Sequence, residues 1–199
     1  RGSLFAVSER LQDKNPGLTR AIERAERNIV RCDQIIEELL TYTRSAKLDL
    51  AATPMDKWLA EVLDEQSVPP GIVVVRTLES GAVAHVDRER FRRCIVNVYA
   101  NACQALSEQN GTADSPGKKR LSVISRVHND RLEILLIDTG PGIPGDVLDK
   151  VMTPLFSTKG FGVGLGLPIV RQIMEQHGGG IEIESTPGVG TTVTLWLPA

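Results

Sequence analysis

The chain has 199 residues, of which 41% are hydrophobic and 24% are charged. This composition provides the core of one ordinary domain with a smaller appendage, and it excludes wholesale disorder. The 23 Lys and Arg residues nearly balance the 25 Asp and Glu residues, which argues against a general nucleic-acid-binding protein with its basic excess. No apolar run is long enough to span a membrane, and the start does not resemble a signal peptide.

The three cysteines, Cys32, Cys94 and Cys103, show neither CxxC spacing nor a Cys/His ligand pattern. This argues against a disulfide framework and a zinc site, and it favours a reducing compartment. We therefore expect a cytoplasmic location, with membrane contact only through parts of the protein outside this sequence. Because the chain opens without a methionine, we expect it to be a fragment.

The first quarter of the chain predicts a long amphipathic helix that starts at Asn15-Pro16. A few apolar residues before it indicate the last turns of a preceding helix, so residues 1–50 are expected to form a helical hairpin with a shortened first arm. One short arm cannot cover so long an apolar seam, and the seam therefore favours self-association. The seam residues follow alternating steps of four and three: Leu18, Ile22, Ala25, Ile29, Cys32, Ile36, Leu39 and Thr43.

The pattern changes around Ala51 to Pro54, where we expect a domain boundary. Apolar residues at helical spacing alternate from there with short β-prone runs, and Asn129-Asp130 predicts a tight turn between two of these runs. Sheet and helices with hairpin-linked strands indicate an α+β fold over residues 54–199. The expected helices span 55–65, 88–106 and 167–177, and the expected strands span 72–76, 121–127, 132–137, 181–184 and 192–197.

Two asparagines lie one helical turn apart in the 88–106 helix. Asn97 and Asn101 therefore share one face beside the apolar stripe. Amide oxygens suit a hard cation such as Mg²⁺ when phosphate oxygens bring the negative charge. Two solvated surface asparagines would give the same pattern, so this feature by itself is weak.

A carboxylate ends the predicted strand over 132–137 and is followed by glycines. Asp138 can accept a hydrogen bond from an exocyclic amine such as that of adenine, and Gly140 and Gly142 let the backbone approach a flat ligand. These glycines and Gly145 match GxGxxG, but they open no long helix and no strand with a terminal acid follows. We therefore reject a dinucleotide site.

A glycine-rich loop over residues 156–166 precedes the last predicted helix. Its amides and the helix N-terminus can bind an anion, and Lys159 can reach a terminal phosphate. The sequence contains no GxxxxGK[ST] string, so this is not a Walker loop. A second glycine turn, Gly188 to Thr191, leads into the final strand and is an ordinary turn on spacing alone.

The order of these segments resembles the catalytic and ATP-binding domain of sensor histidine kinases, within the wider family that includes gyrase, Hsp90 and MutL. The resemblance covers about Pro54 to Ala199. Asn97–Ala105 is similar to the N box and Met152–Lys159 to the F box. Three glycine boxes correspond to Asp138–Ile143, Gly162–Leu167 and Gly188–Thr191. The resemblance implies a Bergerat-type fold, a mixed sheet covered by helices, with ATP and Mg²⁺ as ligands.

Carried over residue by residue, the resemblance implies that Asn101 binds Mg²⁺ and that Asn97 lies where the phosphates and the metal meet. It also implies that Gln104 faces the phosphates and that Asp138 binds the amine of adenine. Asn97 and Lys159 are the expected catalytic residues. The resemblance also places in the ATP site, as base-contacting or lid residues, Gly140, Gly142, Ile143, Thr158, Gly162, Gly164, Leu165, Gly166, Leu167 and Thr191.

The resemblance further implies that residues 35–44 end a dimerisation and phosphotransfer hairpin, with a homodimer and a response regulator as partners. Met152 and Leu155 replace aromatic residues usual in the F box, which affects docking of the lid. None of the three histidines, His85, His128 and His177, lies in the expected helix beside an acid. The phosphoacceptor box would lie in the missing part of the first helix, and the fragment is expected to bind ATP without phosphorylating itself.

Two other functions stay open. An ATP-hydrolysing clamp of the gyrase or MutL kind would carry a glutamate where Asn97 stands, and an amide cannot act as the general base for water. A nucleotide-binding dimeric pseudokinase without chemistry is the second alternative. Asn101, Asp138 and Lys159 argue against it, whereas the missing histidine is compatible with it.

Overall fold

The chain divides into two units, Arg1–Arg44 and Ser45–Ala199. This computed structural model describes residues 24–25, 29, 47–108, 119–157 and 164–199. In the first unit the described residues Arg24, Ala25 and Ile29 are helical, and the rest of the predicted apolar seam lies outside the described residues. The sequence predicts a domain boundary around Ala51–Pro54. The two units divide earlier, after Arg44, and Ala51–Pro54 forms a strand of the second unit.

The second unit contains a five-stranded mixed sheet with the strand order β2-β4-β5-β7-β6. β2 runs parallel to β4, and all other neighbours in this sheet are antiparallel. A separate antiparallel pair joins β1 to β3. The strands are β1 (Ala51–Pro54), β2 (Val73–Leu78), β3 (Val83–Val86), β4 (Arg120–His128), β5 (Arg131–Asp138), β6 (Gly180–Thr186) and β7 (Gly190–Pro198).

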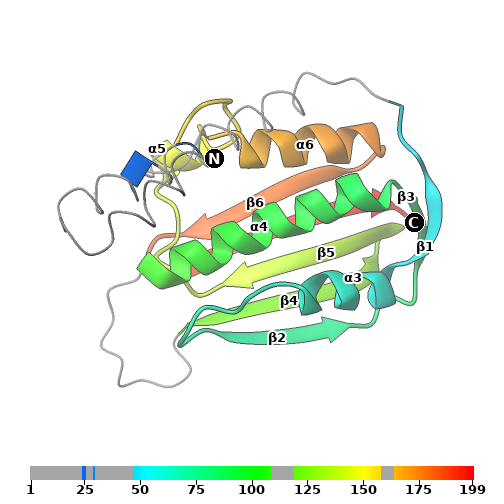
Figure 1. Ribbon diagram of the computed structural model, residues 1–199, viewed down its shortest axis with the longest axis horizontal. Helices are drawn as coiled ribbons and strands as arrows, with labels where there is room; N and C mark the ends of the chain where they lie inside the picture. Colours follow the sequence, from blue (N-terminus) through cyan, green and yellow to red (C-terminus); the bar gives the residue numbers. More distant parts are fainter. Residues whose placement is uncertain (1–23, 26–28, 30–46, 109–118, 158–163) are drawn as a thin grey trace, which may run out of the picture. The chain divides into compact units, whose positions relative to one another are not determined.

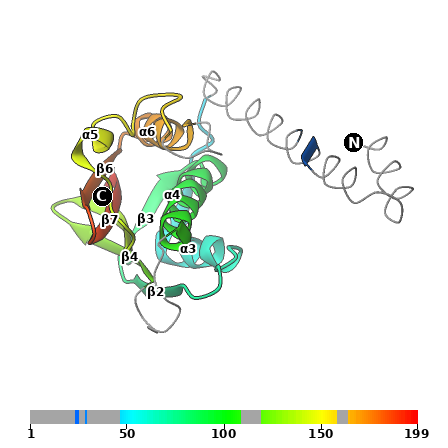
Figure 2. The same cartoon turned by 90° about the vertical axis from the view of Figure 1, so that its left-hand side faces the viewer.

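Helices cover one face of this sheet, so the unit has two layers (Figures 1 and 2). The covering helices are α3 (Met55–Asp64), α4 (Arg88–Glu108) and α6 (Gly166–Gln176), and a short helix, α5 (Gly145–Leu148), follows β5. The mixed sheet with helices on one face confirms the predicted α+β fold. In the part of the chain that the structure describes, no helix is long and apolar enough to cross a membrane.

The core lies between the helices and the sheet. Apolar side chains at helical spacing on α4, among them Phe91, Ile95 and Val98, are buried, and so are alternating residues of β5 such as Ile134 and Leu136. Two cysteines of α4, Cys94 and Cys103, are free thiols buried in the same layer. Burial of this apolar surface is the main force that holds α4 on the sheet.

The hairpin between β4 and β5 forms at the predicted turn. Asn129 and Asp130 both have positive φ, 50° and 56°, which is the backbone of a two-residue type I′ turn. The strands pair from His128 with Arg131 to Leu121 with Asp138. This register brings Asp138 to the last position of β5.

Candidate nucleotide site

The segments predicted to carry the chemistry meet at one end of the sheet. β5 and β6 end there and β7 begins there, beside the C-terminal end of α4 and the first turn of α6 (Figure 1). The segment with α5 leaves from the same end. Residues that lie far apart in the sequence therefore come together around the end of β5.

Asp138 is the buried acid of this site, with 6% of its surface exposed. Its Oδ1 accepts a hydrogen bond from the backbone N–H of Gly140 at 2.8 Å. Burial raises the pKa of Asp138 above the ordinary value, while the N–H groups of Gly140 and Thr191 act in the opposite direction. A largely desolvated carboxylate at a strand end is suited to bind a hydrogen-bond donor such as an amine.

Two glycines allow the backbone to come close around Asp138. Gly142 has φ +70°, and a Cβ on it would lie 2.2 Å from the carbonyl oxygen of Thr186. Gly190 has φ +143°, and its Cβ would lie 2.0 Å from the carbonyl oxygen of Asp138. No other residue fits either position without a shift of the backbone, because real Cβ atoms do not approach so closely. Gly190 thus packs directly against the backbone of Asp138, and Gly142 brings the loop after β5 against the end of β6.

A row of three polar side chains crosses the sheet at the site. Asp138 on β5 pairs with Thr191 on β7, and Thr191 pairs with Ser185 on β6. Because cross-strand partners share one face of a sheet, all three lie on the helix-covered face. Thr191 is thus beside Asp138, where the resemblance implies it.

Ser185 was not predicted as a site residue. The predicted strand stops at Glu184, whereas β6 runs on to Thr186. The alternation of Ile181 and Ile183 already places a polar residue, Ser185, at the next inward-facing position, and that was the available signal.

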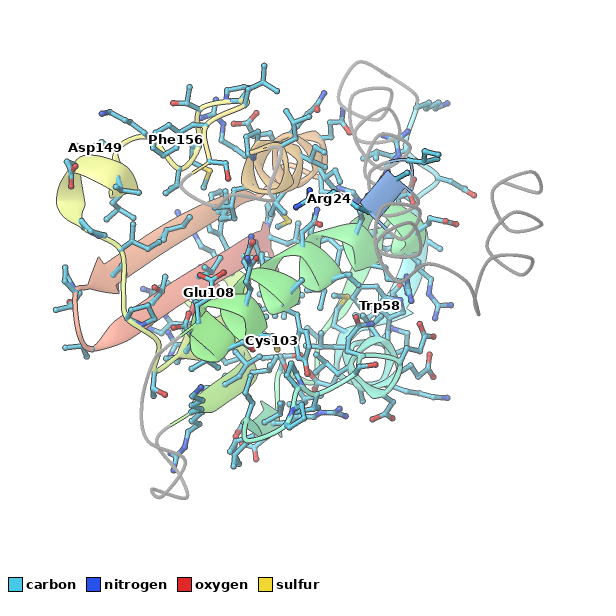
Figure 3. The ribbon with its side chains drawn as sticks, turned by 60° about the vertical axis from the view of Figure 1, so that its left-hand side comes forward. Arg24, Trp58, Cys103, Glu108, Asp149 and Phe156 are labelled. Carbon is cyan, nitrogen blue, oxygen red and sulfur yellow. The ribbon has the colours of Figure 1, made fainter. Side chains whose placement is uncertain are left out.

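A polar stripe on α4 forms the helix side of the site. Asn97, Asn101, Gln104 and Glu108 follow helical spacing and lie on one face. Gln104 Nε2 donates to Glu108 Oε1 at 2.8 Å, and the two asparagines are partly exposed. Figure 3 labels Glu108 in the last turn of α4 and shows Phe156 and Asp149 on the segment between β5 and α6. The predicted metal and phosphate residues therefore share one surface.

The stripe fits a cation only when a ligand brings negative charge. Among the described residues, no group of three or more His, Cys, Asp and Glu side chains could hold a metal ion. The amide oxygens of Asn97 and Asn101 are neutral ligands, as Mg²⁺ accepts when phosphate oxygens complete its shell. The donor set is consistent with Mg²⁺ bound together with a nucleotide.

Part of the predicted lid lies outside the described residues, namely Thr158, Lys159 and Gly162. Its described end begins at Gly164, whose carbonyl oxygen accepts a hydrogen bond from Leu155 N–H at 3.0 Å. Leu165 is buried, and Gly166 and Leu167 open α6. The loop therefore ends at a helix N-terminus, as the sequence predicts.

The chain matches the family described as histidine kinase-, DNA gyrase B- and HSP90-like ATPase over residues 86–199. The sensor histidine kinase ZraS of Escherichia coli (strain K12) is 33% identical over 172 residues, which cover 84% of this chain and 35% of ZraS. The chain thus spans about a third of the length of this relative.

Two solved structures share the fold. Full-length ShkA in complex with AMPPNP has a TM-score of 0.72 at 19% identity and covers 99% of this chain and 45% of ShkA. Histidine kinase ThkA in complex with the response regulator protein TrrA has a TM-score of 0.73 at 23% identity, over 98% of this chain and 56% of ThkA. Because the family match spans more than half of the chain, the protein belongs to the histidine kinase-, DNA gyrase B- and HSP90-like ATPases.

Proposed function

We propose that the Ser45–Ala199 unit binds ATP at the end of β5 and transfers its γ-phosphoryl group to a histidine on a helical hairpin. The observation that carries the proposal is the buried carboxylate of Asp138, beside the close backbone approaches of Gly142 to Thr186 and of Gly190 to Asp138. A desolvated carboxylate binds an amine donor more strongly than an exposed one does. Adenine supplies such an amine at the edge of a flat ring.

In this proposal the base lies against Asp138, Gly140, Gly142 and Ile143, with Thr191 beside them. The phosphates extend toward the polar stripe of α4 and the loop that ends at α6. Asn97 and Gln104 face the phosphates, and the N-terminus of α6 adds favourable electrostatics for negative charge. The remaining lid contacts come from Thr158, Lys159, Gly162, Gly164, Leu165, Gly166 and Leu167.

Asn101 would hold Mg²⁺ together with oxygens of the phosphates. The ion supplies charge neutralisation on the transferred group. The role of the chain is to place that group correctly, since phosphoryl transfer depends mainly on positioning and electrostatics. Asn97 favours transfer to a histidine over hydrolysis, because an amide cannot take a proton from water.

The first unit would be the end of a dimerisation and phosphotransfer hairpin without its phosphoacceptor histidine. Its predicted apolar seam supports a homodimer. ThkA was solved with a response regulator, and we propose a response regulator as the partner that receives the phosphoryl group in this system as well. The free thiols Cys94 and Cys103 are compatible with a cytoplasmic location of the catalytic unit.

Calorimetry with ATP and Mg²⁺ tests the nucleotide site. Asp138→Asn keeps the shape of the side chain but turns one acceptor into a donor, and we expect ATP affinity to fall at least about tenfold. Asp130→Asn is the matched control because Asp130 is exposed, lies just before β5, and has a positive φ that asparagine tolerates. Equal ATP affinities of the two variants would remove Asp138 from the adenine role.

Transfer is tested with γ-labelled ATP and a separate protein that carries a complete hairpin with its histidine. We expect label on that histidine, with a rate limited by the bimolecular encounter. Lys159→Ala should slow transfer more than it weakens ATP binding, since the lysine acts on charge that develops on the moving group. Rapid release of free phosphate without an acceptor would instead place the protein among the ATP-hydrolysing clamps.

A further inference from the structure

The hydroxyl of Ser185 joins its own strand, β6, to two other backbone segments around the nucleotide site. Its Oγ accepts a hydrogen bond from Ile143 N–H at 2.8 Å and donates to the carbonyl oxygen of Gly190 at 3.0 Å. It also lies 2.9 Å from the hydroxyl oxygen of Thr191. The partners come from the loop after β5 and from the first two residues of β7. Ser185 therefore contacts both glycine turns that surround Asp138.

Counting protons fixes the direction of the Ser185–Thr191 hydrogen bond. A serine hydroxyl has one proton and two lone pairs. The Gly190 carbonyl can only accept, so it takes the Ser185 proton, and Ile143 N–H can only donate, so it occupies one lone pair. The second lone pair of Ser185 is then left for Thr191, which must donate its own proton. The reverse direction would leave two oxygens facing each other without a proton at the Gly190 contact.

The hydroxyl of Thr191 consequently offers only lone pairs to a bound base. Thr191 and Asp138 are cross-strand partners on the same face, with 9% and 6% of their surfaces exposed. The ionised Asp138 carboxylate is also an acceptor only. Both side chains at this position therefore present acceptors, which match the 6-amino group of adenine and repel the 6-oxo group of guanine or hypoxanthine.

We propose that Ser185 is a positioning residue that sets the base preference of the site by holding the Thr191 hydroxyl as an acceptor. This inference rests on the proposed function, because it requires that a purine nucleotide binds at Asp138. Without the Ser185 hydroxyl, the Thr191 hydroxyl can rotate and donate its proton to a 6-oxo group. Thr191 is thereby the contact residue, and Ser185 acts through it.

The test compares the affinities of the full chain for ATP and ITP; ITP carries a 6-oxo group in place of the 6-amino group and an N–H at N1 in place of the N1 acceptor of adenine. We expect the wild type to prefer ATP. Ser185→Ala should lower the ATP-to-ITP affinity ratio about three- to tenfold, the effect of one hydrogen bond. Ser185→Thr retains the hydroxyl and should keep the ratio. A general loss of order in the site would weaken both nucleotides equally and leave the ratio unchanged.

The possible outcomes separate this inference from the proposed function. If the wild type binds neither nucleotide, the proposed function fails. If the wild type prefers ATP and Ser185→Ala keeps the same ratio, the role of Ser185 is refuted while the ATP site stands. If Ser185→Ala does not fold, Thr191→Val carries the test, because it removes the acceptor directly. If Thr191→Val has the same ATP-to-ITP affinity ratio as the wild type, the inference is overturned.

Discussion

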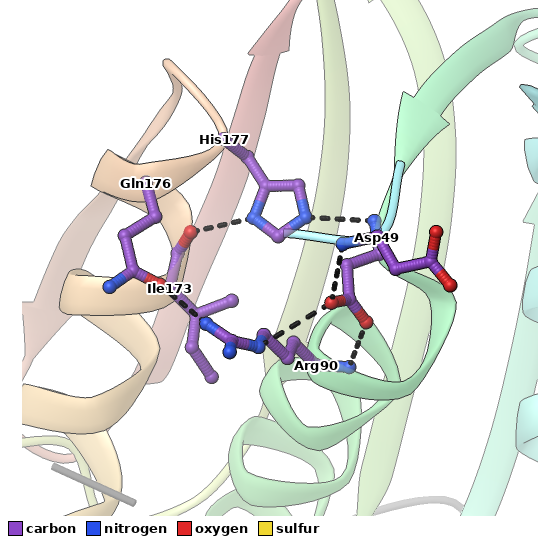
Figure 4. Close-up of polar contacts among 6 residues, drawn as sticks. Asp49, Arg90, Ile173, Gln176 and His177 are labelled. Atoms are coloured by element: carbon purple, nitrogen blue, oxygen red, sulfur yellow. Dashed lines mark hydrogen bonds and ion pairs between the residues drawn. The ribbon is translucent and has the colours of Figure 1, made fainter. Parts of the chain in front are cut away.

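The Nε2 atom of His177 accepts a hydrogen bond from the backbone N–H of Asp87 at 3.0 Å (Figure 4). The other ring nitrogen, Nδ1, donates to the carbonyl oxygen of Ile173 at 2.7 Å, because the hydrogen bond that Nε2 accepts places the ring proton on Nδ1. The Asp87 carboxylate accepts from the N–H groups of Arg90 and Asp49. The contacts thus join the end of α6, the start of α4 and the chain just before β1.

Removal of this ring should destabilise the second unit. We expect His177→Ala to lower the free energy of unfolding by about 1–3 kcal/mol, since it leaves the N–H of Asp87 without its acceptor in a largely buried position. Urea unfolding measures the effect. The control is His128→Ala, because His128 is exposed at the end of β4. Equal stabilities of the two variants would contradict a structural role of His177.

Gly142→Ala should disrupt the nucleotide site. The positive φ alone strains an alanine by about 1–3 kcal/mol, and the added Cβ meets the carbonyl oxygen of Thr186 at 2.2 Å. We expect lower stability together with weaker ATP binding, measured by urea unfolding and calorimetry. Gly145→Ala is the matched control, because nothing lies within 4 Å of its Cβ position. An unchanged Gly142→Ala variant would show that the backbone approach is not required.

The ATP affinity should fall when the solution is made acidic. An amine donor needs the ionised form of Asp138, and burial raises the pKa of this carboxyl above the ordinary 3.8. Protons therefore compete with ATP at a higher pH than they would at an exposed aspartate. Calorimetry at a series of pH values measures this competition. An affinity that stays constant until the ordinary aspartate range is reached would contradict the burial effect.

The raised pKa of Asp138 also affects the stability of the protein without nucleotide. The folded state binds the Asp138 proton more tightly than the unfolded state does. The contribution of Asp138 to stability is therefore largest below the ordinary aspartate pKa and is lost as the pH rises through the raised value. Asp138→Asn removes this titration, so the stability difference between the two proteins should change across that pH range. Urea unfolding of both proteins at several pH values measures it.

Asn101→Ala should remove the effect of Mg²⁺ on ATP binding. The amide oxygen is the expected protein ligand, and no carboxylate cluster among the described residues replaces it. We expect the affinity for ATP with Mg²⁺ to fall toward the affinity without Mg²⁺, while adenosine binding stays unchanged. Ser107→Ala serves as the control, since its hydroxyl donates to the Cys103 carbonyl of its own helix. If Mg²⁺ still strengthens ATP binding to Asn101→Ala as in the wild type, Asn101 is not the ligand.

Local patterns were sufficient to predict much of the fold. Asn129-Asp130 predicts the turn between β4 and β5 because both residues tolerate positive φ. The α4 helix follows from its apolar spacing, and Asp138 lies at a strand end as predicted. In contrast, β1 was not predicted, because its pairing with β3 joins residues separated by a whole helix. The pattern within a four-residue segment does not show such a partner.

The site was predicted less completely than the fold. The glycine turns and Asp138 carry their own local signal, whereas the contacts of Ser185 depend on the fold. Its partner Ile143 lies 42 residues away in the sequence. A serine at the end of a strand has many ordinary roles, and only the register of β6 with β7 places it between the two glycine turns.

Alkylation of the two buried thiols of α4 can be used to measure how often the domain opens. Burial raises the pKa of Cys94 and Cys103, so neither is a reactive thiolate while α4 is packed. After Cys32 is replaced by serine, an alkylating reagent can label Cys94 and Cys103 only when the packing around α4 opens. A nucleotide that binds only the closed form would slow the labelling, so the reaction rate would report occupancy of a site that contains no cysteine.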